Sequence, residues 1–335
     1  MRGKPNFLGK KYRVLFIASM LGWIVSLVGE LSDSIIAGIF INEDAVSAIS
    51  LVQPVFSMLM FLCYLIAGGT GTLYSRAAGE FDTDKAYKTA GMGVLVAILA
   101  GAILGFAMIF GEDLYFQFYA ATEAIEIIAR EYYECFIIVA FIYPIYWTTY
   151  YLVSIDGDAA ACLAVDVTSA IGNAAASLIL VNKFGVKGLA LGTVAALFFS
   201  AIFIVAHFFK KSNSVKIKLH FDKKTFGKMV AIGSSSSLSP LYIAIVDIVI
   251  NKFIIDNFGD SYLAAYAVVN LVLNLACCFS CAIDSIAPFI CVSYGEDNML
   301  GIKKAMKYAN KTTLGLGIFF SAVIIALAKL LPDLY

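Results

Sequence analysis

The sequence predicts an all-α polytopic membrane protein, and three observations support this prediction. Hydrophobic residues make up 61% of the 335 residues and charged residues only 14%, whereas an average soluble domain has about 45–50% apolar and about 25% charged residues. Apolar runs of about 20 residues, long enough to cross about 30 Å of hydrocarbon as a helix, recur along the whole chain. The seven cysteines lie inside these runs, whereas a disulfide framework or a zinc site would place them in loops.

Nine membrane-spanning helices are expected from the apolar runs. Most of the connections between them are short, but one connection is polar and rich in lysine, and it separates the first six spans from the last three. We therefore divide the chain into a cytoplasmic N-terminal tail (1–13), a six-helix lobe (14–209), a basic inter-lobe loop (210–227) and a partial lobe of three helices (228–335). The nine predicted spans are 14–39, 47–75, 89–111, 124–152, 160–182, 187–209, 228–255, 262–291 and 306–331.

The basic residues predict the orientation of the spans, because Lys and Arg near span ends are retained on the cytoplasmic side. With the N-terminus inside, 19 of the 24 Lys and Arg residues fall in the tail, in cytoplasmic loops or at the cytoplasmic ends of spans. We therefore expect a multi-pass protein of the plasma membrane with a cytoplasmic N-terminus. One short predicted cytoplasmic loop departs from this pattern, because residues 154–159 contain Asp156 and Asp158 but no basic residue.

An internal repeat suggests two related helical bundles around a central cavity. The segment 45–55 after Asp33 resembles the segment 262–272 after Asp247, and Gly79-Glu80 recurs as Gly295-Glu296, 216 residues later. Because six spans separate the copies, both copies have the same orientation, which implies an axis along the membrane normal. The second copy ends after three spans, so either the chain is a fragment that lacks three helices, which we favour, or the protein has an unusual architecture.

Acidic residues within the spans mark candidate ion sites, because a charge in hydrocarbon is costly and usually faces a bundle interior or water. Asp33 in the first span is the leading candidate, since its apolar surroundings favour the protonated form. Glu30 lies one turn earlier on the same face; it either shares a proton with Asp33 or is a solvated residue that lines the cavity.

Three further acids have competing interpretations. Asp166 lies near the cytoplasmic start of the fifth span, where it either serves a pathway or meets lipid headgroups. Asp247 lies deeper in the seventh span, with Asn251 one turn on, and is a candidate second site. Asp284 lies towards the inner end of the eighth span, where helix packing or contact with the membrane surface would explain it equally well.

Aromatic and polar residues suggest a substrate cavity. Gln53, beside Pro54 in the second span, would line it, while Tyr146 and Tyr150 in the fourth span would stack against a flat organic cation. The same tyrosines would also suit a membrane-interface belt. The pair Cys278 and Cys281 lies mid-membrane outside any redox fold. The sequence contains no Walker motif, metal-ligand cluster or nucleophile constellation, so we expect no enzyme activity, no metal and no cofactor.

Four stretches resemble the multidrug and toxic compound extrusion (MATE) transporters. They cover most of the chain in the family's order, and they are 32–38, 48–54, 185–193 and 288–295. The resemblance implies a fold of typically twelve helices in two lobes, which exports organic, often cationic, compounds by antiport with Na⁺ or H⁺. It also implies a cation site in the N-terminal lobe.

The family's first-span aspartate corresponds to Asp33, and Asn173 and Thr193 match two of its partners. A further family aspartate is replaced by Ser177, which supplies an oxygen but no charge. This replacement weakens the expectation of a Na⁺ site and leaves that of a proton site. Asp166, seven residues before Asn173, is about 10 Å away along the helix and too far to substitute for the missing acid.

The resulting hypothesis is a cation-coupled antiporter, in which Asp33 alternates between binding H⁺ or Na⁺ and permitting substrate to bind. Its expected partners are a small organic substrate and membrane lipids, without nucleic acid, and we expect a monomer. A lipid-linked oligosaccharide flippase of the same superfamily is the closest alternative, although it would need basic residues within the spans. A non-transporting membrane protein is a third.

Overall fold

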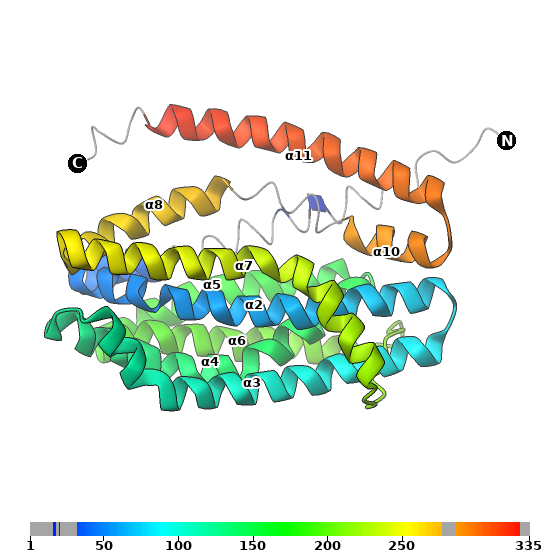
Figure 1. The fold of residues 1–335 in the computed structure, drawn as a ribbon, viewed down its shortest axis with the longest axis horizontal. Helices are drawn as coiled ribbons and strands as arrows, with labels where there is room; N and C mark the ends of the chain where they lie inside the picture. Colours follow the sequence, from blue (N-terminus) through cyan, green and yellow to red (C-terminus); the bar gives the residue numbers. More distant parts are fainter. Residues whose placement is uncertain (1–15, 18–19, 21–31, 277–285, 329–335) are drawn as a thin grey trace.

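The computed structural model describes residues 16–17, 20, 32–276 and 286–328, which form a bundle of long helices (Figure 1). Every regular element in these ranges is helical, so the predicted all-α class is confirmed. The tail 1–13, Glu30, Asp284 and the Cys278–Cys281 pair lie outside the described residues. Of the first predicted span, residues 32–40 are described as a helical segment.

Helix bounds follow the predicted spans and extend beyond several of them. Six of the helices, α2 to α7, are long and apolar enough to cross a membrane, while nine spans and the division into lobes stay predictions. The elements are α2 (Glu43–Gly79), α3 (Thr83–Tyr119), α4 (Glu123–Ile155), α5 (Ala159–Phe184), α6 (Val186–Phe208), α7 (Lys223–Phe258), η1 (Asp260–Tyr262), α8 (Leu263–Ala276), α10 (Ala287–Gly295) and α11 (Met299–Ala328).

Short polar side chains begin several of the long helices. Asn42, Asp82, Asp158 and Asp222 each accept a hydrogen bond from the backbone N–H three residues on, at 2.8–3.1 Å. Such an N-cap satisfies one of the donors that a helix start leaves unpaired. Each of these four helices therefore starts at a polar residue that caps it.

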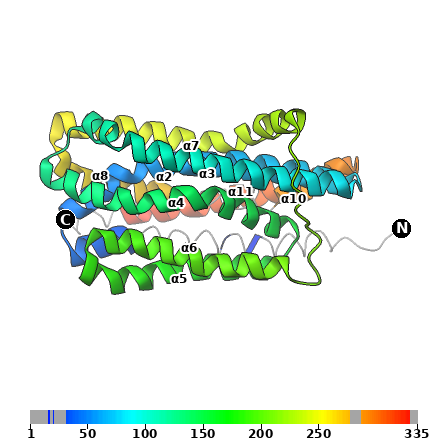
Figure 2. The ribbon, with the colours of Figure 1, turned by 90° about the horizontal axis from the view of Figure 1, so that it is seen from below.

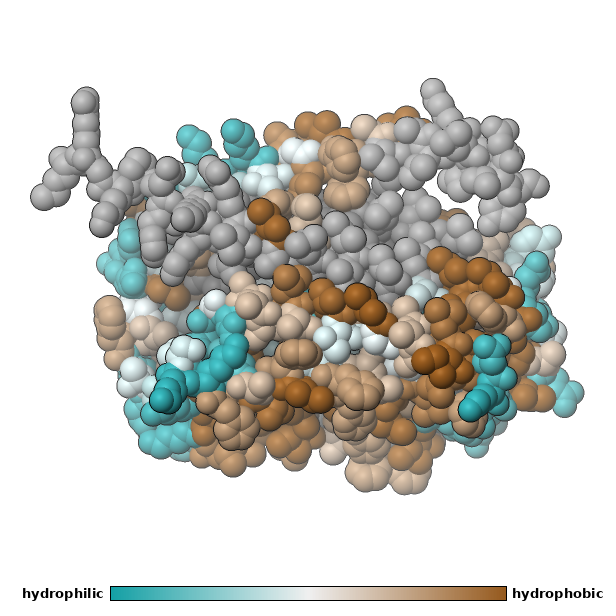
Figure 3. Space-filling view, turned by 180° about the vertical axis from the view of Figure 1, so that it is seen from behind, coloured by the Kyte–Doolittle hydropathy of each residue, from teal (hydrophilic) through white to brown (hydrophobic). Residues whose placement is uncertain are grey.

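The two ends of the bundle differ in charge. The α2–α3, α4–α5, α6–α7 and α10–α11 connections all lie at one end, on the right of Figure 1, and we call it the basic end. It is the end that the charge pattern predicts as cytoplasmic. Between the ends, brown residues dominate the surface and teal residues gather mostly towards the two ends (Figure 3). Large hydrophobic side chains such as Ile103 and Phe110 are exposed, as expected of a surface that faces lipid.

Helix α2 lies at the centre of the bundle, in contact with α3, α4, α7, α8 and α10. Glycines permit these contacts: a Cβ atom on Gly68 would collide with Ser236 of α7, and one on Gly69 with the carbonyl group of Met229. A Cβ atom on Gly71 would meet the ring of Tyr151 on α4 at 2.5 Å. The glycine cluster of the second span thus serves close helix packing, which is common where helices meet in a membrane.

The two turns that the predicted repeat pairs, after α2 and after α10, have the same local structure. Phe81 and Asp297, 216 residues apart, both adopt a positive φ, of 60° and 54°. The next residues, Asp82 and Asn298, each accept from the N–H three residues on, at 3.0 and 2.9 Å. Two sequence-distant turns therefore share both their backbone conformation and their capping bond.

Candidate cation site

Asp33 lies in a polar cluster formed by three helical segments. Its segment, 32–40, brings the carboxylate against α5 and α6, which lie side by side on one flank of the bundle (Figure 2). The α5–α6 turn is tight because Gly185 adopts φ +57°, and α6 begins at the next residue. This turn fixes the register of the two helices and places their polar residues at one level.

Three side chains donate hydrogen bonds to the Asp33 carboxylate. Nδ2 of Asn173 and Oγ of Ser177 both lie 3.1 Å from Oδ1, and Oγ1 of Thr193 lies 3.3 Å from Oδ2. Asp33 is 7% exposed, Asn173 9% and Ser177 0%. A buried carboxylate is tolerated only when such donors or a cation compensate its charge. The structure thus brings together four residues that the sequence predicted, Asp33, Asn173, Ser177 and Thr193.

The cluster also holds oxygen atoms that suit a small hard cation. Oδ1 of Asn173 accepts from Thr193 at 3.1 Å and from Ser177 at 3.4 Å. Asn173 thus turns its oxygen towards the two hydroxyl groups and its NH₂ towards Asp33. Hydroxyl groups rotate and both donate and accept, so they can turn from the carboxylate to a bound ion. Among the named residues, Asp33 alone carries a negative charge, which a single proton or Na⁺ neutralises.

Asp247 lies in a second buried cluster, on α7. Its carboxylate is 2% exposed and accepts hydrogen bonds from the Tyr266 hydroxyl at 3.0 Å and from Nδ2 of Asn270 at 3.1 Å. Asn251, one turn further on, donates instead to the backbone carbonyl of Ser50 on α2, at 3.0 Å. The two candidate residues therefore have different partners, and Asn251 joins α7 to α2.

Sequence reasoning missed both donors to Asp247. Tyr266 and Asn270 lie one turn apart on α8, within an apolar run, and such spacing places two polar groups on one helix face. The four-residue spacing of Tyr266 and Asn270 was the signal available in the sequence. It identifies them as partners of Asp247 only when α8 is known to pack beside α7.

The aromatic candidates lie in a different part of the N-terminal six helices. Tyr146 of α4 is 8% exposed and stacks on Tyr143, with ring centroids 5.9 Å apart. The Tyr146 hydroxyl lies 3.0 Å from Ser200 of α6, and the Tyr150 hydroxyl donates to Asp166 at 3.1 Å. Gln53 is half-buried on α2. A cavity that brings all three to a substrate stays a prediction.

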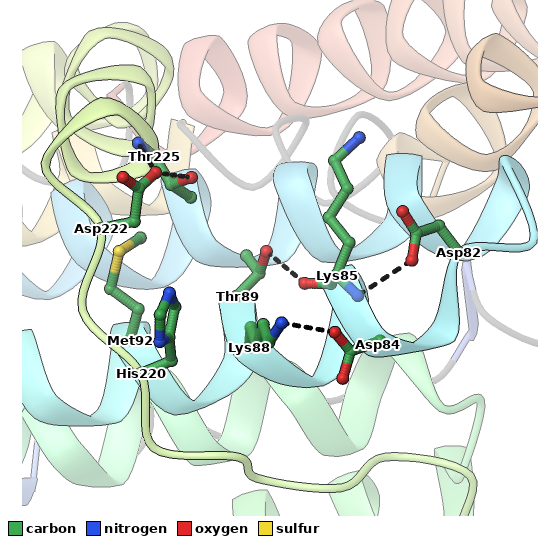
Figure 4. Close-up of a pocket in the computed structure, with 9 residues that line it drawn as sticks. All are labelled: Asp82, Asp84, Lys85, Lys88, Thr89, Met92, His220, Asp222 and Thr225. Atoms are coloured by element: carbon green, nitrogen blue, oxygen red, sulfur yellow. Dashed lines mark hydrogen bonds and ion pairs between the residues drawn. The ribbon is translucent and has the colours of Figure 1, made fainter.

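At the basic end, a cavity of about 320 Å³ lies between the start of α3 and the inter-lobe loop (Figure 4). Lys85, Lys88 and His220 line it together with three aspartates, so its charges are mixed. Lys88 pairs with Asp84 at 2.5 Å, and Lys218 of the loop pairs with the same carboxylate at 2.6 Å. Hydrogen bonds from these two lysines lower the pKa of Asp84 to about 2. The Lys218–Asp84 ion pair beside this cavity holds the inter-lobe loop against α3.

Fold and site together define an all-α, multi-pass membrane protein with buried carboxylates at helix interfaces. In a comparison with known protein families, the MatE family model matches residues 18–179. Over 258 residues the chain is 24% identical to the multidrug export protein MepA of Staphylococcus saprophyticus, and the match covers 75% of this chain and 57% of that protein. It is 22% identical over 286 residues to the probable multidrug resistance protein YoeA of Bacillus subtilis, covering 82% and 61%.

Solved structures share the fold. The crystal structure of a MATE mutant superposes with a TM-score of 0.84 at 25% identity, covering 99% of this chain and 75% of that one. A MOP-superfamily transporter from Pyrococcus furiosus gives 0.82 at 23% identity, covering 96% and 72%. The chain therefore resembles the MATE family of membrane transporters. It spans 57% of the length of MepA and 61% of that of YoeA.

Proposed function

We propose that the protein exports organic cations and drives their export by binding a proton at Asp33. The observation that carries this proposal is the buried Asp33 carboxylate, held by donors from both α5 and α6. MepA and YoeA are named for multidrug export and multidrug resistance, which supports a drug-like substrate. The proposal places the protein in the plasma membrane as a monomer, with its N-terminus and basic end in the cytoplasm.

The coupling step follows from the charge of the cluster. When Asp33 is ionised, it keeps its three donors oriented; a proton on one carboxylate oxygen turns that oxygen into a donor, so at least one neighbouring hydroxyl must rotate. Binding of a proton therefore rearranges contacts between the segment 32–40 and two other helices. When two conformations of a protein bind H⁺ with different affinities, proton binding shifts the balance between them. Such a shift couples ion binding to alternating access.

A proton suits the cluster better than Na⁺. Hard metal cations bind best where several oxygens and enough negative charge surround them. Of the named residues only Asp33 supplies a charge, and Ser177 stands where the family pattern has a second carboxylate. Export driven by a Na⁺ gradient would therefore contradict this part of the proposal.

Transport by the full chain in proteoliposomes tests the proposed function. We expect an imposed proton gradient to drive export of tetraphenylphosphonium, and a Na⁺ gradient alone to drive none. Asp33→Asn should remove the driven export while the protein stays folded. Asp113→Asn is the matched control, because the Asp113 side chain is 82% exposed and pairs with Arg130, outside the Asp33 cluster, and it should transport like the parent. Proton-driven export by Asp33→Asn at the parent rate would contradict the proposal.

A further inference from the structure

Polar side chains continue from the Asp33 cluster towards the basic end, between α5 and α6. We call them the α5–α6 seam, and its members come from the start of α5, from α6 and from the facing side of α4. They are Asp158, Asp166 and Ser169, Ser200 and His207, and Tyr146 and Tyr150.

Helix register explains why these residues line up. On α6, Thr193, Ser200 and His207 are seven residues apart, which is close to two helical turns, so they share one face. On the antiparallel α5, Asn173 meets Thr193, and Asp158 meets His207. Asp166 lies about 10 Å from Asn173 along α5, at 1.5 Å per residue, and thus midway between these two contacts.

The middle of the seam holds a carboxylate among hydroxyl groups. Asp166 accepts a hydrogen bond from the Tyr150 hydroxyl at 3.1 Å. The Tyr146 hydroxyl lies 3.0 Å from Oγ of Ser200, which is 0% exposed, and Ser169 lies beside the same tyrosine. Among the residues that the structure describes, the titratable groups that face Asp166 are Tyr146 and Tyr150 of α4 and Cys162 of its own helix.

Asp166 makes no ion pair within the part of the chain that the structure describes. A carboxylate that is held by a hydroxyl group and not by a fixed cation is therefore suited to take up and release a proton. The neighbouring hydroxyl groups both donate and accept hydrogen bonds, so they can pass a proton on.

At the basic end, the seam finishes in a histidine that is hydrogen-bonded to one aspartate and lies near a second. His207 is 1% exposed; its Nδ1 lies 2.8 Å from Oδ2 of Asp158, and its Nε2 lies 3.1 Å from Oδ2 of Asp156. Lys210, which is half-exposed, contacts Asp158 at 2.5 Å. This cluster links a buried imidazole to the surface, and it pairs both acids of the loop 154–159 with partners from α6 and the residues after it.

We propose that the α5–α6 seam conducts the proton between Asp33 and the basic side, with Asp166 holding it midway. This inference rests on the proposed function, in which Asp33 exchanges a proton. The proton leaves the Asp33 carboxyl group, passes over the hydroxyls of Ser169, Tyr146 and Ser200 and intervening water, and binds Asp166. From there it reaches the Asp158–His207 pair and bulk water. Each transfer breaks one O–H or N–H bond and forms another, and Asp33 is left ionised.

The rate of proton release tests the path. Purified full chain is mixed with tetraphenylphosphonium in a stopped-flow instrument, and a pH-indicator dye reports the protons released. Asp166→Asn should release as many protons per bound substrate as the parent, but at least about tenfold more slowly, since it removes a transfer group and leaves the Asp33 site intact. Asp166→Glu should restore most of the rate, which a merely structural role of Asp166 would not predict.

Two further variants complete the design. Ser200→Ala, a change of one oxygen atom, should also slow release without changing its amplitude, and it tests the path if Asp166→Asn fails to fold. Asp113→Asn should match the parent. Release at the parent rate in both Asp166→Asn and Ser200→Ala would overturn the path while leaving coupling at Asp33 in place. A parent protein that binds tetraphenylphosphonium but releases no proton would instead overturn the proposed function, and the path with it.

Discussion

Gly79 and Gly295 lie against each other at the basic end, and their surroundings are reciprocal. A Cβ atom on Gly79 would lie 2.6 Å from the carbonyl oxygen of Val292 and 3.1 Å from Cα of Gly295. A Cβ atom on Gly295 would lie 2.5 Å from the carbonyl oxygen of Arg76 and 3.1 Å from Cα of Gly79. Equivalent residues meet in this way only near a two-fold axis, so the axis that relates the two copies passes close to this contact.

We predict that Gly79→Ala destabilises the protein, because a methyl group there meets backbone atoms that cannot move aside. Overpacking of this kind costs about 1–3 kcal/mol. Gly111→Ala is the control: a Cβ atom on Gly111 would have no neighbour within 4 Å, and Ala is favoured over Gly within a helix by about 1 kcal/mol. Thermal unfolding in detergent should therefore shift in opposite directions for the two variants. Equal shifts would argue against a tight contact between the repeats.

Acid should weaken the Asp158 cluster. Burial alone raises the pKa of Asp158, but hydrogen bonds from Lys210, His207 and the Ala161 N–H outweigh it and lower the pKa to about 2. A depressed pKa means that the ionised form stabilises the fold above the ordinary aspartate value of 3.8. This stabilisation is lost as the pH falls from that value towards about 2, because the folded state then takes up the proton.

We predict that Asp158→Asn lowers the unfolding temperature near neutral pH, and that its difference from the parent shrinks as the pH falls through that window. Asn keeps the N-cap of α5, so the variant isolates the charge. Asp158→Ala removes the cap as well and should be less stable than Asp158→Asn at every pH. If Asp158→Asn and the parent unfold at the same temperature near neutral pH, the ionised carboxylate contributes nothing to the stability of the fold.

A second acid beside Asp33 should create a metal-cation site. The Ser177 hydroxyl lies 3.1 Å from Oδ1 of Asp33, so Ser177→Asp places two carboxylates next to each other. Their repulsion favours a bound cation that both can share. We expect Na⁺, but not an equal concentration of choline chloride, to raise the unfolding temperature of this variant. The parent and Ser177→Asn should show no such difference; a Na⁺ response in Ser177→Asn equal to that of Ser177→Asp would refute the argument.

Apolar run length predicted most of the fold, because the membrane requires about 20 apolar residues per helix. It underestimated helix length. The span predicted at 89–111 is the centre of α3, Thr83–Tyr119, since the helix continues into polar residues that hydropathy does not count. The repeat was visible in a few residues, such as Gly79 and Gly295, but the reciprocal contact between them required coordinates.

The site was only partly visible in the sequence. Asn173 and Thr193 were assigned to Asp33 through the family resemblance, since periodicity does not connect residues 140 and 160 positions apart. Ser200 and His207 were missed as partners because a single serine or histidine near a span end is common. Their seven-residue spacing from Thr193 was a signal, but its meaning depends on the antiparallel packing of α5 against α6.

Competition between proton and substrate tests the central claim most directly. If Asp33 must lose its proton for an organic cation to bind, each affects the affinity of the other reciprocally. The dissociation constant of tetraphenylphosphonium, measured by equilibrium binding between about pH 5 and about pH 8, should rise by up to about tenfold per unit of acidification in the parent. In Asp33→Asn it should be independent of pH, and a pH dependence in this variant equal to that of the parent would contradict the account.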